Sequence, residues 1–103
     1  MAVLRDYTSG SWLVREGQEA EFIKRWEEFA RQSAKISPGS GDFYLIQEKN
    51  NPRHFLSFGS WASQQAVDDW RSSPGFKEFI GKCKELCEDF QPSDYSLKVS
   101  SQE

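Results

Sequence analysis

His54 is the only histidine in the 103-residue chain, and its imidazole is the only side chain whose ordinary pKa lies near neutrality. Such a group can act as a general base that removes a proton from a bound substrate. His54 follows the turn residues Asn50, Asn51 and Pro52, at the edge of a predicted hairpin where exposed side chains are usual. Two interpretations therefore stay open: a base that reaches a pocket, and an ordinary histidine at the surface.

Aromatic residues are the second group that could do chemistry. The eight Phe, four Trp and three Tyr equal in number the four Val, four Ile, six Leu and one Met. Flat side chains can form a slot that stacks a planar molecule and excludes water, and they can equally form an ordinary core. The residues that we expect to line such a slot, and so to bind substrate, are Trp12, Trp26, Trp70 and Phe76.

Motifs for nucleophiles, metals and cofactors are lacking in the sequence. Cys83 and Cys87 lie four apart in a predicted helix, a spacing typical of neither a disulfide framework nor a zinc site. They are either a thiol site or, more simply, a small core residue and its neighbour. No glycine-rich phosphate loop, nucleophile elbow or histidine–carboxylate cluster occurs, so no cofactor and no metal are implied.

Length and charge exclude further classes of protein. We expect a single domain over residues 1–103, with an ordered core over about residues 5–99. The 13 Lys and Arg and 16 Asp and Glu give a net charge of −3 spread along the chain, which argues against binding nucleic acid through a basic surface. No segment approaches the roughly 20 apolar residues of a membrane span, and no signal peptide is evident. We therefore expect a cytoplasmic protein with no membrane partner.

Periodicity predicts the elements that must position these residues. Gly10 interrupts the first strand, which indicates a bulge or a close backbone approach. Ser63 is expected to cap the second helix and Pro74 to begin the third. The expected strands cover residues 7–14, 42–49, 53–61 and 94–99, and the expected helices cover residues 18–36, 63–73 and 74–90.

This order of elements, β-α-β-β-α-β with a broken second helix, predicts a ferredoxin-like α+β fold. In that fold the helices cover one face of a four-stranded antiparallel sheet. The consecutive apolar residues 43–46 give their strand apolar side chains on both faces, whereas a strand facing water would alternate. We therefore expect a homodimer in which the uncovered sheet faces of two copies pack together.

Two sequence patterns resemble the antibiotic biosynthesis monooxygenase family. One is W-x-S-x-x-A-x-x-x-W-x-x-S-x-x-F, which runs from Trp61 to Phe76, and the other is G-x-E-x-x-F, which runs from Gly17 to Phe22. The resemblance implies a dimeric α/β barrel, and it makes Trp70 a position that the family uses in its pocket. Members include cofactor-free monooxygenases of quinols or anthrones, haem-degrading enzymes and proteins without known activity.

The haem-degrading branch of that family can be tested at three positions. By resemblance it uses an Asn on the first strand, a Trp at the end of the W-R-S helix and a His on the following helix. This chain keeps the Trp as Trp70, but the first-strand position falls at or near Gly10, and the His position is Ile80. Without an imidazole there, no axial iron ligand is evident, so haem oxygenation is not expected.

These observations lead to an expected function that rests mainly on the resemblance, because fold alone does not give function. The leading expectation is a cofactor-independent monooxygenase acting on a hydroxylated aromatic of the quinol or anthrone type. In that scheme His54 would be the base that forms the substrate anion. The alternative is a non-catalytic dimer that binds a small aromatic molecule, and haem binding without degradation is a more distant third.

Overall fold

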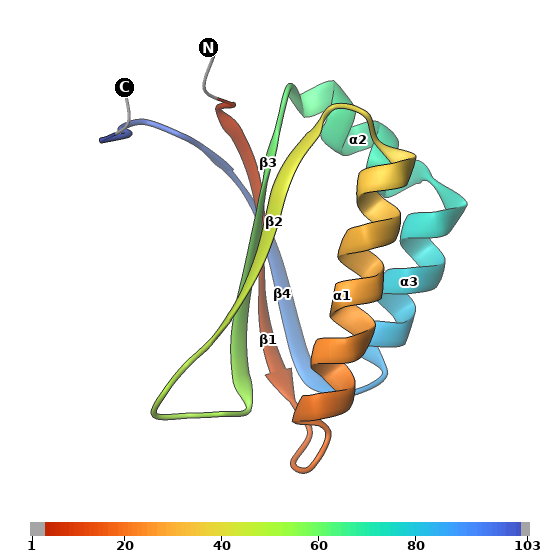
Figure 1. The fold of residues 1–103 in the computed structure, drawn as a ribbon, viewed down its shortest axis with the longest axis vertical. Helices are drawn as coiled ribbons and strands as arrows, with labels where there is room; N and C mark the ends of the chain where they lie inside the picture. Colours follow the sequence, from red (N-terminus) through yellow and green to blue (C-terminus); the bar gives the residue numbers. More distant parts are fainter. Residues whose placement is uncertain (1–3, 102–103) are drawn as a thin grey trace.

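The computed structural model describes residues 4–101, which form an antiparallel sheet with helices on one face (Figure 1). The strands lie in the order β2-β3-β1-β4, and the two helices of the broken pair follow β3. The predicted ferredoxin-like arrangement is therefore confirmed. The elements are β1 Asp6–Val14, α1 Glu19–Ile36, β2 Ser40–Gln47, β3 His54–Trp61, α2 Gln64–Ser72, α3 Pro74–Lys84 and β4 Cys87–Ser96.

The starts of α2 and α3 follow from local chemistry. The Ser63 hydroxyl accepts a hydrogen bond from the Ala66 backbone N–H at 3.1 Å, and the Ser73 hydroxyl accepts one from the Phe76 N–H at the same distance. Each bond satisfies a backbone donor that has no partner within its helix. Pro74 lies in the first turn of α3, where its missing N–H costs nothing. Both predicted helix starts are confirmed.

The predicted end of the last helix is wrong. We expected helix to Phe90 and a strand over residues 94–99, but α3 ends at Lys84 and β4 begins at Cys87. The apolar spacing before Phe90 fits a helix, yet this segment pairs with β1, where Phe90 lies opposite Trp12 and Pro92 opposite Gly10. Because β4 is an edge strand, its proline can point its missing donor away from the sheet.

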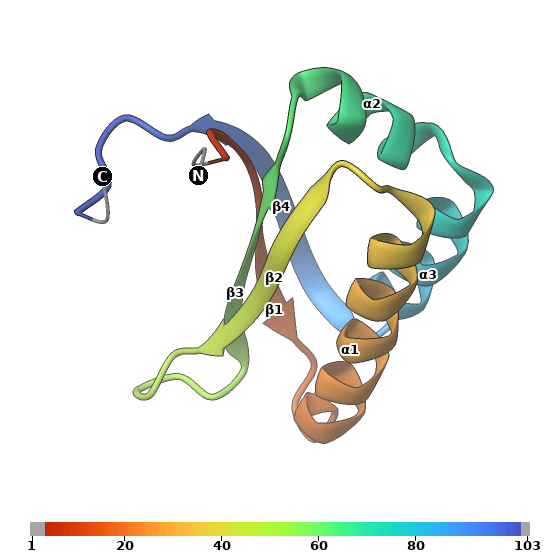
Figure 2. The same cartoon turned by 45° about the horizontal axis from the view of Figure 1, so that its top comes forward.

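The two faces of the sheet differ in what covers them. Along β3, Phe55, Ser57 and Trp61 are buried under the helices, while Leu56 and Phe58 point away. Figure 2 shows all three helices on the same side of the curved sheet. The large exposed apolar side chains of the uncovered face are Tyr44, Ile46, Leu56, Phe58 and Tyr95.

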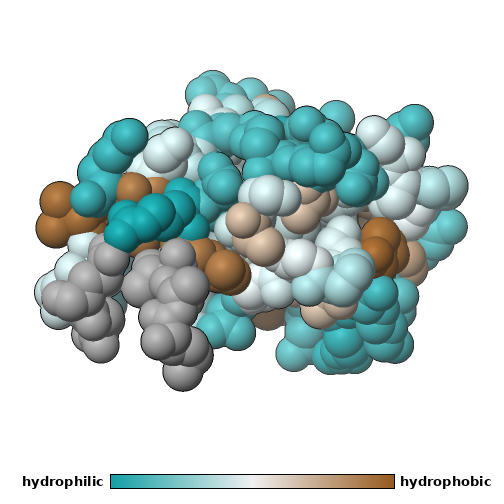
Figure 3. Space-filling view, turned by 90° about the horizontal axis from the view of Figure 1, so that it is seen from above, coloured by the Kyte–Doolittle hydropathy of each residue, from teal (hydrophilic) through white to brown (hydrophobic). Residues whose placement is uncertain are grey.

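Figure 3 shows the molecule from one end, with brown apolar patches on its left and on its right among much teal hydrophilic surface. The core lies between the two layers. Its fully buried rings include Trp12, Phe22 and Trp61, which are 1%, 0% and 0% exposed. The helix-facing side of the sheet is thus the aromatic interior that the composition predicted.

Candidate functional site

One cavity of about 50 Å³ lies between the sheet and the helices, and the four aromatic residues predicted from the sequence all line it. Trp12 comes from β1, Trp26 from α1, Trp70 from α2 and Phe76 from α3. The fold therefore brings together residues that are up to 64 positions apart in the chain. That these four bind a ligand stays a prediction.

The rings around the cavity contact one another directly. Trp70 lies edge-on to Phe76, with ring centroids 4.6 Å apart, and Trp12 is stacked on Phe90 at 3.9 Å. Phe43 also lines the cavity, 6.4 Å from Trp70. The sequence reasoning did not include Phe43 and Phe90 in the slot. Strand alternation was the signal for Phe43, whereas Phe90 was hidden by the wrong helix boundary.

Hydrogen bonds fix three of the four indole rings. Each of these indole N–H groups donates to a buried hydroxyl, and the pairs are Trp12 to Ser57 at 2.9 Å, Trp61 to Thr8 at 3.0 Å and Trp70 to Ser33 at 2.8 Å. Buried polar groups normally find such partners. Trp26 is the exception, because its Nε1 is buried without a hydrogen-bond partner.

Gly10 makes room for one of these pairs. A Cβ at this position would lie 2.8 Å from Trp12 Nε1, 2.9 Å from Ser57 Oγ and 2.9 Å from a ring carbon of Phe90. Contacts this short force neighbours to shift, so only glycine fits here. The structure thus selects the close backbone approach among the two readings of Gly10, since its register with β3 and β4 is regular.

The polar side chains of the cavity are few and lack acidic groups. Thr8, Ser57 and Arg71 line it, and no carboxylate or imidazole is among the described lining residues. The Arg71 guanidinium donates to the Asp94 carboxylate at 2.9 Å and thereby links α2 to β4. This pairing lowers the pKa of Asp94 below its ordinary value, although burial opposes it. The Arg71 charge at the cavity is therefore balanced by the Asp94 carboxylate.

Two open clefts flank the cavity and share its lining. One, of about 530 Å³, includes Trp26 and Phe43, and the other, of about 540 Å³, includes Phe76 and Phe90. The cavity itself has room for only a few water molecules. A ring-sized ligand therefore has to displace the half-buried phenylalanines, and the clefts offer the space for it.

A family model for antibiotic biosynthesis monooxygenases matches residues 10–82, which is most of the chain and includes most of the cavity lining. The chain belongs to the antibiotic biosynthesis monooxygenase family. The family assignment confirms the resemblance seen in the two sequence patterns. No curated protein sequence matches the chain.

Solved structures confirm the fold. SnoaB, a cofactor-independent oxygenase from Streptomyces nogalater, superposes with a TM-score of 0.87 at 18% identity, over 98% of this chain and 100% of its own. A conserved protein from Methanosarcina mazei gives 0.82 at 21% identity, over 92% and 94% of the two chains. A protein from Shewanella oneidensis gives 0.79 at 17% identity, over 91% of each chain.

The three positions compared with the haem-degrading branch all line the same cavity. Gly10 lies on its sheet side, Trp70 on α2 and Ile80 on α3. Position 80 thus presents an aliphatic side chain to the cavity. Since no described lining residue carries an imidazole, these residues do not fit the axial ligation of a haem iron.

His54 lies away from these aromatic residues. It begins β3 on the face turned away from the helices and is not among the residues that line the cavity. Its Nε2 lies 2.9 Å from Ser11 Oγ and its Nδ1 lies 2.9 Å from Glu48 Oε1. This order matches a Ser-His-acid relay, but the strand that carries Ser11, β1, is paired on both sides, so its own backbone is engaged in the sheet. The role of His54 as a base stays a prediction.

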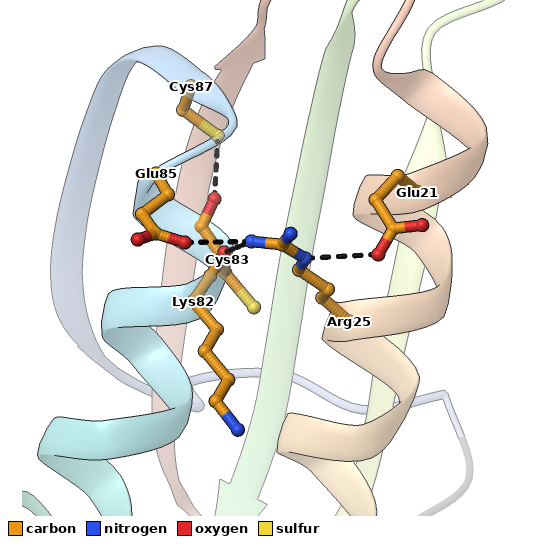
Figure 4. Close-up of polar contacts among 6 residues, drawn as sticks. All are labelled: Glu21, Arg25, Lys82, Cys83, Glu85 and Cys87. Carbon is orange, nitrogen blue, oxygen red and sulfur yellow. Dashed lines mark hydrogen bonds and ion pairs between the residues drawn. The ribbon is translucent and has the colours of Figure 1, made fainter.

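The two cysteines lie at the end of α3 and the start of β4, in the cluster drawn in Figure 4. Arg25 on α1 donates to Glu21, to Glu85 and to the backbone carbonyl of Lys82, and so holds α1 against the end of α3. Burial raises the pKa of the Cys83 thiol to about 12 and that of Cys87 to about 11. Both are therefore neutral thiols at neutral pH, as expected of core residues.

The described residues lack two further features. No helix within residues 4–101 is long and apolar enough to cross a bilayer. Over the same part of the chain, no three His, Cys, Asp or Glu side chains gather as a group that would hold a metal ion.

Proposed function

We propose that the protein is a cofactor-independent monooxygenase that acts on a hydroxylated aromatic molecule of the quinol or anthrone type. The observation that carries this proposal is the cavity in which Trp12, Trp26, Trp70 and Phe76 meet. The family assignment supports monooxygenase chemistry. The fold neighbour SnoaB, a cofactor-independent oxygenase, supports the absence of a cofactor requirement.

The chemistry needs an electron-rich substrate in a dry site. Loss of a proton from a phenol or enol gives an anion that can pass electrons to O2. For an anthrone, the methylene carbon loses two hydrogens and gains one oxygen atom as a ketone, and the second oxygen atom leaves as water. The substrate supplies all four electrons, so no external reductant is required. The aromatic lining contributes by stacking the ring and excluding water, which strengthens electrostatic effects on the anion.

We also propose that the protein acts as a homodimer joined by the uncovered sheet faces. Five large apolar side chains are exposed on that face, with Tyr44 52% and Leu56 43% exposed. Such a surface is unfavourable in water and is self-complementary in a twofold dimer. Leu56→Glu should convert the dimer to a monomer in size-exclusion chromatography with light scattering.

Ile23 provides a matched control for this change. It is 44% exposed but lies on α1, on the opposite side of the molecule from the sheet face. Ile23→Glu should therefore leave the dimer intact. A wild type that is monomeric at micromolar concentration would contradict the dimer proposal.

The alternative is a non-catalytic dimer that binds a small aromatic molecule. One observation favours it: no described residue of the cavity lining carries a carboxylate or imidazole that would accept a substrate proton. An oxygenase can use such a cavity only if the site stabilises a substrate anion that forms without a neighbouring base. The two functions share the binding site and differ in turnover.

Oxygen consumption separates them. Purified, metal-stripped protein would be mixed with a panel of hydroquinones and anthrones in an oxygen electrode, with autoxidation subtracted. The oxygenase proposal predicts uptake above autoxidation that is lost in Trp70→Ala. Binding of the same compounds without uptake would instead establish the binding protein.

A further inference from the structure

We infer that Thr8 and Ser57 donate hydrogen bonds to the ligand, and that the ligand is a planar aromatic with a phenolate, enolate or carbonyl oxygen. The inference rests on the proposed function only in taking the cavity as the binding site. It names the chemical group that the cavity recognises, whether the protein turns the ligand over or only binds it.

The two hydroxyls form part of a small hollow in the sheet. Thr8 on β1 lies opposite Gly59 on β3, and Gly10 on β1 lies opposite Ser57 on β3. All four residues line the cavity and face the helices. The two hydroxyls stand at diagonal corners, and the rings of Phe43 over Gly59 and Phe90 over Gly10 lie between them, so a ligand that reaches both hydroxyls has to displace these rings.

Each hydroxyl has a proton to donate and no acceptor for it. Ser57 Oγ accepts the N–H of Trp12 at 2.9 Å, and Thr8 Oγ1 accepts the N–H of Trp61 at 3.0 Å. Neither hydroxyl donates to another residue within the described part of the chain. Thr8 is 6% exposed and Ser57 is 8% exposed, so bulk water does not readily serve as the acceptor. A buried hydroxyl that only accepts is a half-satisfied group.

The rest of the lining is also rich in donors and poor in acceptors. Trp26 is 92% buried, since 8% is exposed, and its Nε1 has no partner. Arg71 lines the cavity with its charge paired to Asp94, and the described lining contains no carboxylate side chain. The missing acceptor therefore has to come from the ligand. An anionic oxygen suits such donors best, because hydrogen bonds to charged groups are stronger than those between neutral groups.

This arrangement explains how a cavity without a base can favour an ionised ligand. Donors that stabilise the oxyanion more than the neutral phenol lower the pKa of the bound phenol. The site then selects the reactive form of the ligand without removing the proton through a side chain. A hydrocarbon of the same shape gains nothing from these donors.

The test compares 2-naphthol with naphthalene, which share a ring system and differ by one oxygen atom. Binding of each would be measured through quenching of tryptophan fluorescence, in the wild type and in Thr8→Val and Ser57→Ala. We expect the wild type to prefer 2-naphthol by roughly tenfold or more, and each variant to lose most of that preference. Naphthalene affinity should change little, and the bound naphthol, followed by its absorbance, should ionise at a lower pH in the wild type.

Two controls separate hydrogen bonding from structural damage. Thr8→Ser keeps the hydroxyl and should keep the preference. Ser33→Ala removes an indole acceptor of the same kind, the partner of Trp70 at 2.8 Å, from a position outside the cavity lining. It should lower the free energy of unfolding as the other variants do, yet keep the ratio of the two affinities.

The outcomes are distinct. Equal affinity of the wild type for the two probes, or a preference that survives in both Thr8→Val and Ser57→Ala, overturns this inference and leaves the proposed function standing. If neither probe binds, the cavity is not the ligand site, and both the inference and the proposed function are overturned.

Discussion

The two faces of the sheet carry similar numbers of aromatic and aliphatic side chains, but these are buried on one face and exposed on the other. On the helix-facing side, Trp12 and Trp61 are fully enclosed, and their N–H groups are hydrogen-bonded to hydroxyls. On the uncovered side, Tyr44 and Tyr95 are 52% and 59% exposed. We therefore propose ligand binding on the first face and contact with a second copy of the chain on the other.

The only histidine falls on the second of these faces. His54 is held there between Ser11 and Glu48, away from the aromatic cavity. The imidazole and the ring-stacking side chains of the cavity are thus on opposite faces of the sheet, whereas the carboxylates of Glu27 and Asp94 line the two flanking clefts. The described lining of the cavity contains aromatic rings and hydrogen-bond donors and no imidazole or carboxylate.

The largest difference between the faces should appear when a ring is truncated. Trp70 is 6% exposed and contacts Trp61 and Phe76 at centroid distances of 4.6 Å, so Trp70→Ala should cost about 3–5 kcal/mol of unfolding free energy. Tyr44→Ala on the open face should cost only about 1 kcal/mol. Urea unfolding of both variants measures the contrast, and equal losses would contradict it.

A smaller effect is expected from a single added methyl group in the hollow. Gly10→Ala places a Cβ within 2.9 Å of Trp12 and Ser57, so it should cost about 1–3 kcal/mol through overpacking and abolish ligand binding. Gly81→Ala is the matched control, because its Cβ meets nothing within 4 Å on α3. It should stabilise the protein by about 0.5–1 kcal/mol. Binding that survives in Gly10→Ala would place the ligand elsewhere.

Part of the cavity lining could be predicted from the sequence. Strand alternation and helical spacing place Trp12, Trp26 and Trp70 on inward faces, so their meeting around one cavity was predictable. Phe90 was misplaced because its spacing from Cys83 fits a helix, and only pairing with β1 decides otherwise.

The hydroxyls of Thr8 and Ser57 could not have been found in the same way. Small polar residues on a strand are typical of an exposed face. These two are buried, and each accepts a hydrogen bond from the indole N–H of a tryptophan that is distant in the sequence. His54 follows its turn as expected, but it begins an inner strand of the sheet, and the face that it occupies depends on strand pairing that the sequence does not determine.

A still smaller effect on the unfolding free energy should come from the ion pair between Arg71 on α2 and Asp94 on β4. The Arg71 guanidinium lowers the pKa of Asp94 below its ordinary value of 3.8. The stabilisation is therefore fully present above that ordinary pKa and is lost as the pH falls through the lower folded-state pKa. Because both side chains are about one-third exposed, it amounts to about 0.5 kcal/mol.

Urea unfolding across this acidic range would measure the stability that the Arg71–Asp94 ion pair contributes. In Asp94→Asn the acid-dependent loss should disappear and stability at neutral pH should fall slightly. An unchanged pH dependence in Asp94→Asn would show that the ion pair does not form in solution.

The smallest effect is expected on the open face. A general base that acts in the reaction contributes about 10²–10⁴-fold to the rate. Since His54 does not line the cavity, His54→Ala should change oxygen uptake by less than about twofold. A loss on the scale of a general base would restore His54 as the base of the sequence-based prediction and would move the chemistry to the uncovered face.

NMR of the four indole N–H groups and the single histidine would show whether an aromatic ligand occupies the helix-facing cavity. Each indole signal would be assigned with a Trp→Phe variant, and 2-naphthol would then be titrated into the wild type. We expect the largest changes in chemical shift at the indole N–H groups of Trp12, Trp26 and Trp70, and none at the ring protons of His54. Shifts at His54 with the cavity indoles unmoved would contradict this expectation.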